Sequence, residues 1–246
     1  MKQLTFFFAI LSMTFAQTSV GQNTSDALNA QFFQAYATAS VPLWENGIAQ
    51  LEKSDETDPL ELAKTYYAAA SIYMIREQED KAADLLSKSE KILKKLLKAD
   101  KKAAEPNALL SGVYGMQIAL APMKGMTLGM KSSNLLERAL ESAPDNPFVH
   151  LFKGNNLYYT PSMFGGDLAK SVEHFEKARQ GFEAQDSKIY WAYLTTMAHL
   201  GQAHHKRKDL DKAKTVYDDV LAVSPNFGWV KYSLSPSLEK DLKARK

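Results

Sequence analysis

The chain has 246 residues, of which 45% are hydrophobic and 24% charged, and its formal net charge is only +2. These values are those of a folded globular or repeat protein and exclude a mainly disordered chain. So small a net charge indicates neither a nucleic-acid nor a membrane partner through bulk electrostatics. Because the sequence contains no cysteine, disulfide bonds, thiol nucleophiles and thiolate metal sites are excluded.

The N-terminal segment has the pattern of a secretory signal peptide. Lys2 precedes an apolar run from Leu4 to Phe15, and small residues stand at the −3 and −1 positions of a cleavage site after Ala16. We therefore expect residues 1–16 to be removed, or alternatively residues 1–21. An apolar run of about 12 residues is too short to cross a bilayer, so no membrane span is expected in the mature chain. Without a lipoprotein cysteine, the pattern predicts a Gram-negative periplasmic protein.

Small residues recur at regular intervals through the rest of the chain. Ala70–Ser89 and Gly201–Val220 are both intervals of 19 residues, and Ala139–Gly154 is an interval of 15. Such self-similarity is typical of stacked helical hairpins in which small residues stand where helices cross. Proline follows the second helix, as Pro225 does after Val220.

These intervals predict four hairpin units, near residues 62–98, 105–144, 147–185 and 189–225. A degenerate pair is expected before them. A last helix from Phe227 is expected to cover the end of the stack, followed by a lysine-rich tail that frays.

Surplus residues in the intervals predict departures from a regular repeat. Units two and three carry insertions between their own helices, beginning near Ala121 and Tyr159. In units one and three the surplus lies after the second small residue, which predicts second helices about two turns longer. In the second insertion, Gly165-Gly166 is expected to bend the chain and Asp167 to cap the next helix.

The spacing of Leu200-Gly201, Ala213, Tyr217, Val220 and Pro225 resembles the tetratricopeptide repeat family. The resemblance implies an all-α solenoid, with residues 23–246 as a single repeat domain that binds partners and is not an enzyme. The insertions are similar to those of a secreted bacterial subgroup. The second is also similar to the T-component of TRAP transporters, a periplasmic repeat protein thought to associate with a solute-binding partner.

In the resembled family, fixed positions of each first helix line a concave groove. Carried over to this chain, they predict a groove rich in aromatic residues, methionine and amides, suited to a peptide or an apolar ligand. Alternatively, tight curvature packs these side chains together as core. The candidate groove residues are Tyr67, Met74, Leu109, Met116, Asn155, Tyr158, Tyr159, Gln202 and His205.

The two insertions form a second candidate surface. Both lie at turns within hairpins, so both are expected to project from one edge of the stack. Exposed methionine and phenylalanine side chains there would form an apolar interaction patch. The candidates on this insertion edge are Met123, Met126, Met163 and Phe164.

Residue patterns that would indicate catalysis are absent from the sequence. The five histidines form no H-E-x-x-H motif, and the chain has neither a G-x-S-x-G motif nor a P-loop. We therefore expect no catalytic residues, metal or cofactor. The predicted function is an exported binding module with a protein or peptide partner. The alternatives are a periplasmic carrier of a small molecule or lipid, for which a cavity sealed by the insertions is expected, and an unrecognised envelope enzyme.

Overall fold

The computed structural model describes residues 15–245, which form helices and turns and, within that range, no strand. Five helical hairpins succeed one another, which confirms the all-α repeat fold, the four predicted units and the pair before them. The hairpins are α1 (Phe15–Ala37) with α2 (Val41–Lys53), α3 (Pro59–Ile75) with α4 (Glu79–Ala99), α5 (Ala104–Leu120) with α6 (Gly125–Ser142), α7 (Pro147–Tyr159) with α8 (Leu168–Ala184), and α9 (Trp191–Lys206) with α10 (Leu210–Val223).

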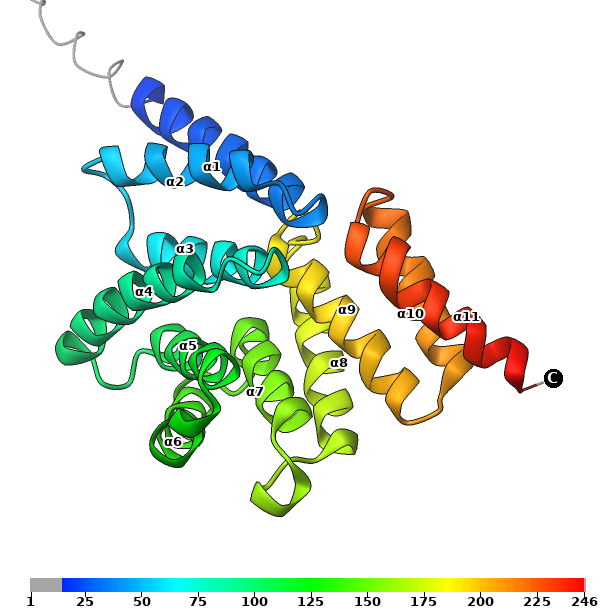
Figure 1. Cartoon of the computed structure of the whole chain (residues 1–246). Coiled ribbons are helices and arrows are strands. Elements are labelled where there is room, and N and C mark those ends of the chain that lie inside the picture. Colours follow the sequence, from blue (N-terminus) through cyan, green and yellow to red (C-terminus); the bar gives the residue numbers. More distant parts are fainter. Residues whose placement is uncertain (1–14, 246) are drawn as a thin grey trace, which may run out of the picture.

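The first helices of the five hairpins form a closed ring. Contacts join α1 to α3, α3 to α5, α5 to α7 and α7 to α9, and α9 in turn contacts α1. Figure 1 shows the hairpins following one another in an arc until the C-terminal end of α1 meets α9. A stack of hairpins that closes on itself leaves no long open groove between its ends. None of the helices in residues 15–245 combines the length and the apolar run that a transmembrane span requires.

Aromatic side chains fill the centre of this ring. The Trp191 ring lies 6.1 Å from the ring of Tyr36, 6.2 Å from that of Tyr67 and 6.1 Å from that of Phe148, measured between centroids. All four side chains are buried. Because they come from α1, α3, α7 and α9, this cluster joins helices that are far apart in sequence, and we call it the aromatic centre.

Three of the hairpins turn in the same way between their two helices. Ala39, Glu77 and Lys208 have φ values of 49°, 57° and 67°, so each turn contains one left-handed residue. In each turn the next amide donates to a carbonyl five residues back, at 2.9 Å. This arrangement satisfies carbonyls that the end of a helix leaves without a partner.

Units two and three replace that turn with the predicted insertions. The first becomes a 3₁₀ turn (η1, Pro122–Lys124) followed by extra residues of α6, and the second becomes η2 (Ser162–Phe164). Gly165 is left-handed, with φ 94°, and the Asp167 side chain accepts hydrogen bonds from the amides of Ala169 and Lys170, both at 3.0 Å. The expected bend and the expected helix cap are both confirmed.

One of the two predicted helix extensions is wrong. The surplus in unit one does lengthen α4, which has 21 residues. In unit three, however, α8 ends at Ala184 and the surplus forms a loop over residues 185–190. Asp186 has φ 52° in that loop, and the amide of Ser187 donates to the carbonyl of Phe182. The helix therefore ends in the same left-handed turn that closes the short hairpins.

The C-terminal segment is more ordered than expected. A π-helical turn (η3, Val230–Leu234) continues directly into α11 (Ser235–Ala244) and lets the helix pass Pro236, which has no amide hydrogen to donate. The Arg245 guanidinium then donates to both carboxylate oxygens of Asp211, at 2.9 and 3.0 Å. The capping helix is confirmed, and the prediction that the tail frays is wrong.

Candidate functional site

The aromatic centre divides the predicted groove residues into two groups. Tyr67 and Leu109 are buried in the core and line no open surface. The other predicted residues lie toward the C-terminal ends of the inner helices, where the ring opens again. Tyr159 is exposed, and the half-buried members are Met74, Met116, Asn155, Tyr158, Gln202 and His205.

Tyr159 is paired with a buried histidine that sequence reasoning did not select. The Tyr159 hydroxyl lies 2.9 Å from Nε2 of His199, and Nδ1 of the same ring lies 2.8 Å from the carbonyl oxygen of Thr195. A carbonyl only accepts, so Nδ1 carries the proton and Nε2 accepts from Tyr159. Burial lowers the pKa of His199 to about 4, and the ring is therefore neutral at pH 7.

This burial predicts a loss of stability in mild acid. The pKa of His199 in the folded chain lies below the unfolded value of about 6.5, so the unfolded state takes up the proton first as the pH falls. The contribution of the neutral His199 ring to stability is complete above about pH 6.5 and is lost as the pH falls toward 4. The loss amounts to about 2 kcal/mol at pH 5. Urea unfolding at pH 7 and pH 5 should show a smaller pH effect in His199→Gln. An equal pH effect in both proteins would contradict the prediction.

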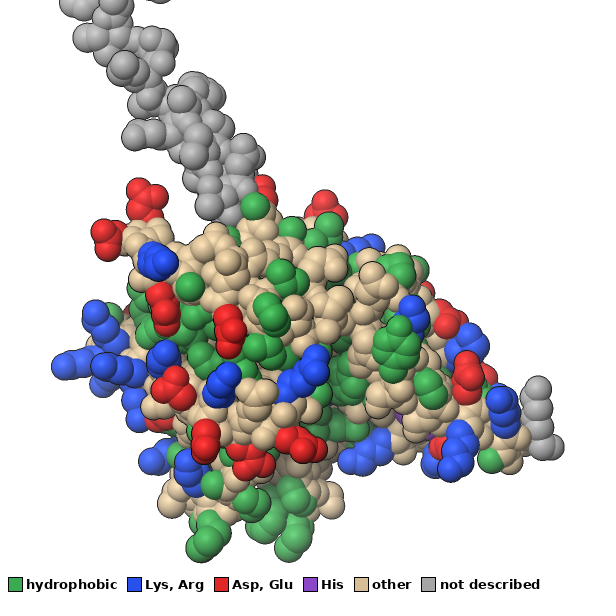
Figure 2. All heavy atoms as spheres, turned by 45° about the horizontal axis from the view of Figure 1, so that its top comes forward, with side chains coloured by type: hydrophobic (Ala, Val, Ile, Leu, Met, Phe, Trp, Pro, Cys, Tyr) green, Lys and Arg blue, Asp and Glu red, His purple; other side chains and the backbone are tan. Residues whose placement is uncertain are grey.

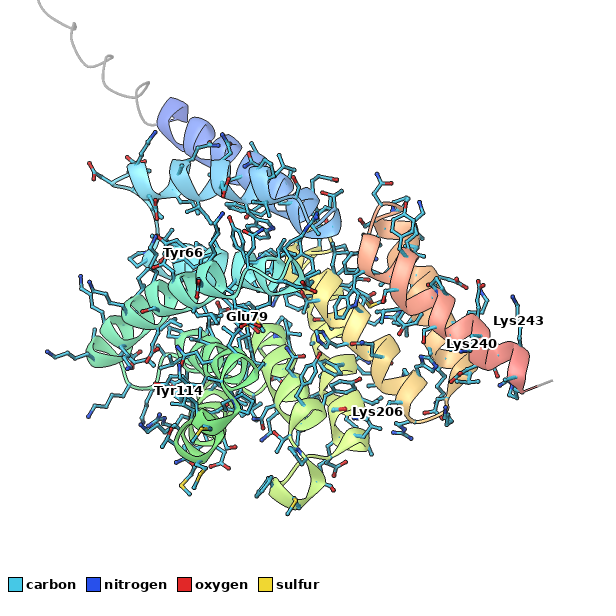
Figure 3. All side chains as sticks on the ribbon, in the orientation of Figure 1. Tyr66, Glu79, Tyr114, Lys206, Lys240 and Lys243 are labelled. Carbon is cyan, nitrogen blue, oxygen red and sulfur yellow. The ribbon has the colours of Figure 1, made fainter. Side chains whose placement is uncertain are left out.

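Two amide side chains near Tyr159 keep unused hydrogen-bond acceptors. The side-chain oxygens of Asn155 and Gln202 are buried, and no described residue donates to either of them. Lys206, labelled in Figure 3, holds its ammonium group 4.8 Å from the centroid of the Tyr158 ring. The predicted residue His205 instead contacts the capping helix, with Nε2 3.1 Å from the Asp241 carboxylate.

A large hollow lies at the opposite mouth of the ring, at the N-terminal ends of the inner helices. It has a volume of about 2180 Å³ and is half open to solvent. We call it the recess. Its walls come mainly from α1, α2, the N-terminal ends of α3, α5, α7 and α9, the turn between α2 and α3, and the loop at 185–190. Its aromatic lining consists of Phe32, Phe148, Phe182, Tyr190 and Trp191.

The lining of the recess is acidic. Six carboxylates stand against three ammonium groups, so its formal charge is three minus six, or −3, in a chain of net charge +2. The carboxylates are those of Asp26, Glu56, Asp58, Glu61, Glu105 and Asp186, and the ammonium groups are those of Lys53, Lys64 and Lys188.

A buried ion-pair network forms part of this wall. The Lys64 ammonium lies 2.7 Å from carboxylate oxygens of both Glu61 and Glu105, and 4.9 Å from the centroid of the Phe148 ring. The side-chain amide of Asn146 donates a hydrogen bond to the Glu105 carboxylate at 3.0 Å. Burial disfavours the ammonium charge, but the surrounding negative groups outweigh burial and raise the pKa of Lys64 above its usual value. The lysine charge is therefore neutralised locally.

Sequence reasoning missed the recess because no periodic pattern marks it. Its walls combine helix ends from several hairpins with the turn between α2 and α3 and the loop at 185–190, and the ring must close before these face one another. The family's inner-surface positions were the available signal, since they include Lys64 and Phe148. Among residues 15–245, no group of three or more histidine or acidic side chains is arranged to hold a metal ion.

The residues predicted for the insertion edge lie at the surface. Met123, Met126, Met163 and Phe164 are all exposed. In Figure 1, α6 and the turn between α7 and α8 lie at the same lower end of the molecule.

The geometry of the last hairpin agrees with a known family. Residues 194–227, which cover most of α9 and all of α10, match the family model described as Tetratricopeptide repeat. This segment is a tetratricopeptide repeat. The matched segment contains Gly201, where an added Cβ would overlap the Tyr217 ring, so the crossing of the two helices requires glycine.

Solved structures share this tetratricopeptide repeat architecture. The HusA haemophore from Porphyromonas gingivalis matches with a TM-score of 0.52 and 21% identity, over 80% of this chain and 96% of that one. A thermophilic tetratricopeptide repeat protein from Thermus thermophilus matches with a TM-score of 0.51 and 16% identity, over 90% and 96%. Identities this low show the fold alone. No curated protein matches this chain.

Proposed function

We propose that this helical repeat protein is a non-enzymatic binding module that holds a basic, apolar segment of another protein in the recess. The observation that carries the proposal is the sign of the charge there, −3 in the lining against +2 for the chain. A low-dielectric hollow lined by one sign of charge attracts a partner of the other sign. Most of the aromatic lining is buried, so apolar contact area comes from the exposed Ile189 and the half-buried Tyr190.

A carrier of a small apolar ligand is the second candidate. The fold likeness to a haemophore and the exposed Tyr159 ring, 5.7 Å from the His199 ring, favour it. A carrier was expected to have a cavity sealed by the insertions, and the recess is not such a cavity. The recess is half open, and the insertions lie at the other ends of the inner helices. An open, charged hollow suits a peptide better than an apolar ligand.

Removing the charge of the recess tests the leading proposal. Glu56→Lys with Asp186→Asn changes the charge by +3 and brings the lining to zero. We expect it to weaken binding of a lysine-bearing apolar peptide about tenfold at low ionic strength, and less at high salt. Asparagine at 186 tolerates the left-handed backbone there. Fluorescence anisotropy with labelled synthetic peptides measures the effect.

The matched control is Glu137→Lys with Glu141→Gln on α6. It changes the net charge by the same +3 at exposed positions outside the recess, and it should bind as the unaltered protein does. A second peptide with glutamates in place of the lysines should bind weakly. Equal binding of both peptides, or equal losses in both variants, would contradict the proposal. Binding of hemin but of neither peptide would favour the carrier.

We further propose that the protein is exported to the periplasm. Lys2 and the apolar run from Leu4 support this proposal, although residues 1–14 lie outside the described residues. N-terminal sequencing of protein from a periplasmic extract is expected to begin at Gln17, or at Gln22 for the alternative cleavage site. Recovery of a chain that retains Met1 and stays in the cytosol would show that export does not occur.

A further inference from the structure

The two insertions present five large apolar side chains to solvent. These side chains are between 72% and 93% exposed, and they make up half of the ten exposed large hydrophobic residues in the described part of the chain. Figure 2 shows hydrophobic side chains gathered at the lower end of the molecule, where Figure 1 places α6 and the α7–α8 turn. We call this surface the insertion tip; its residues are Met123, Met126, Met130, Met163 and Phe164.

The backbone holds these side chains in place. Met126 and Met130 are four residues apart on α6 and so share one helix face. In the second insertion, the amide of Gly166 donates to the carbonyl of Pro161 at 3.2 Å, and that of Asp167 to the carbonyl of Leu157 at 3.0 Å. An added Cβ at Gly166 would overlap the carbonyl of Thr160, so only glycine lets the two backbone segments of this turn approach so closely. The exposed Phe164 therefore stands on an ordered turn.

The charges within the two insertion segments have one sign. Residues 106–136 include Lys124 and Lys131 and contain no aspartate or glutamate. Residues 154–166 carry no charged side chain, and the next carboxylate, Asp167, caps α8 and lies 3.6 Å from Lys170. The tip thus combines protruding apolar groups with lysines that have no nearby carboxylate in their own segment.

We propose that the insertion tip docks on the surface of an anionic lipid bilayer. Methionine and phenylalanine would enter the boundary between headgroups and acyl chains, and Lys124 and Lys131 would contact anionic headgroups. A bilayer surface receives two protruding insertions at once without shape matching, whereas a protein partner would need a groove for each. Unbranched methionines suit such a fluid surface because they hold no fixed shape.

Docking by the tip leaves the recess open. Pro147 and Phe148, at the start of α7, line the recess, and the second insertion follows the other end of that helix. A helix of 13 residues is about 20 Å long. The recess therefore lies away from the bilayer, and this proposal does not depend on what the recess binds.

Co-sedimentation with vesicles tests the proposal. Full-length mature protein should pellet with vesicles of phosphatidylcholine and phosphatidylglycerol, and less with phosphatidylcholine alone. The single variant Phe164→Ser should reduce partitioning onto vesicles about tenfold or more. The double variant Met126→Ser, Met130→Ser should do the same. Tyr232→Ser is the matched control, since it removes an aromatic ring of similar exposure from η3, and it should pellet as the unaltered protein does. Lys124→Glu with Lys131→Glu should abolish the preference for anionic vesicles.

Three results would overturn the proposal. The first is an unaltered protein that pellets with neither kind of vesicle. The second is equal pelleting of the Phe164→Ser and Tyr232→Ser variants. The third is a dimer in sedimentation velocity that the Met126→Ser, Met130→Ser variant converts to a monomer, because a second copy of the chain would then cover the tip.

Discussion

Replacing Trp191 by alanine is expected to lower the free energy of unfolding by about 3–5 kcal/mol, the largest single effect we predict. Trp191 is buried and its ring packs against Tyr36 of α1, Tyr67 of α3 and Phe148 of α7. Its removal leaves a cavity where helices from four hairpins meet. Because a cavity at a junction of rigid helices cannot collapse fully, the lost contacts are not regained.

Urea unfolding followed by circular dichroism measures this loss. Trp229→Ala is the control, because that side chain is only half-buried and should cost less than half as much. Limited proteolysis gives a second measure. Loss of the α1–α9 contact should expose the α2–α3 turn at residues 54–58, so the first hairpin should be released sooner. If Trp191→Ala unfolds at the same urea concentration as the unaltered protein, the aromatic centre does not hold the ring closed.

Replacing Gly201 by leucine is expected to cost about 1–3 kcal/mol through overpacking. Even a Cβ at this position overlaps the ring of Tyr217, whose side chain is buried on α10. The helices must therefore separate or Tyr217 must leave its place. Thermal unfolding should show the loss, and Tyr217→Ala should relieve part of it, so the two changes together should cost less than their sum.

Gly115→Leu is the matched control for this prediction. Gly115 is an exposed residue of α5, and an added Cβ there meets no atom within 4 Å. Leucine is the better helix former, so this change should leave the melting temperature unchanged or raise it. If the Gly201→Leu protein has the same melting temperature as the unaltered protein, the helices do not cross at this residue.

Much of the candidate insertion edge was predictable, but little of the candidate recess was. Exposure of Met163 and Phe164 follows from their place in an insertion that no regular repeat position can bury. The role of Tyr67 depended on whether the concave side stayed open, and here it belongs to the aromatic centre. Hydropathy cannot tell a residue that lines an open groove from one that is buried in a core, because an aromatic side chain suits both places equally.

The sequence by itself determined the hairpins, their order and their crossings, because these depend on local spacing. Intervals of 19 and 15 residues, helix caps such as Asp167 and glycines such as Gly201 act within one or two units, where chain geometry leaves few choices. Tertiary structure alone decided that α1 meets α9, that Trp191 fills the centre and that carboxylates from separate hairpins face one recess. Small rotations between successive units accumulate over five hairpins, and no single unit encodes their sum.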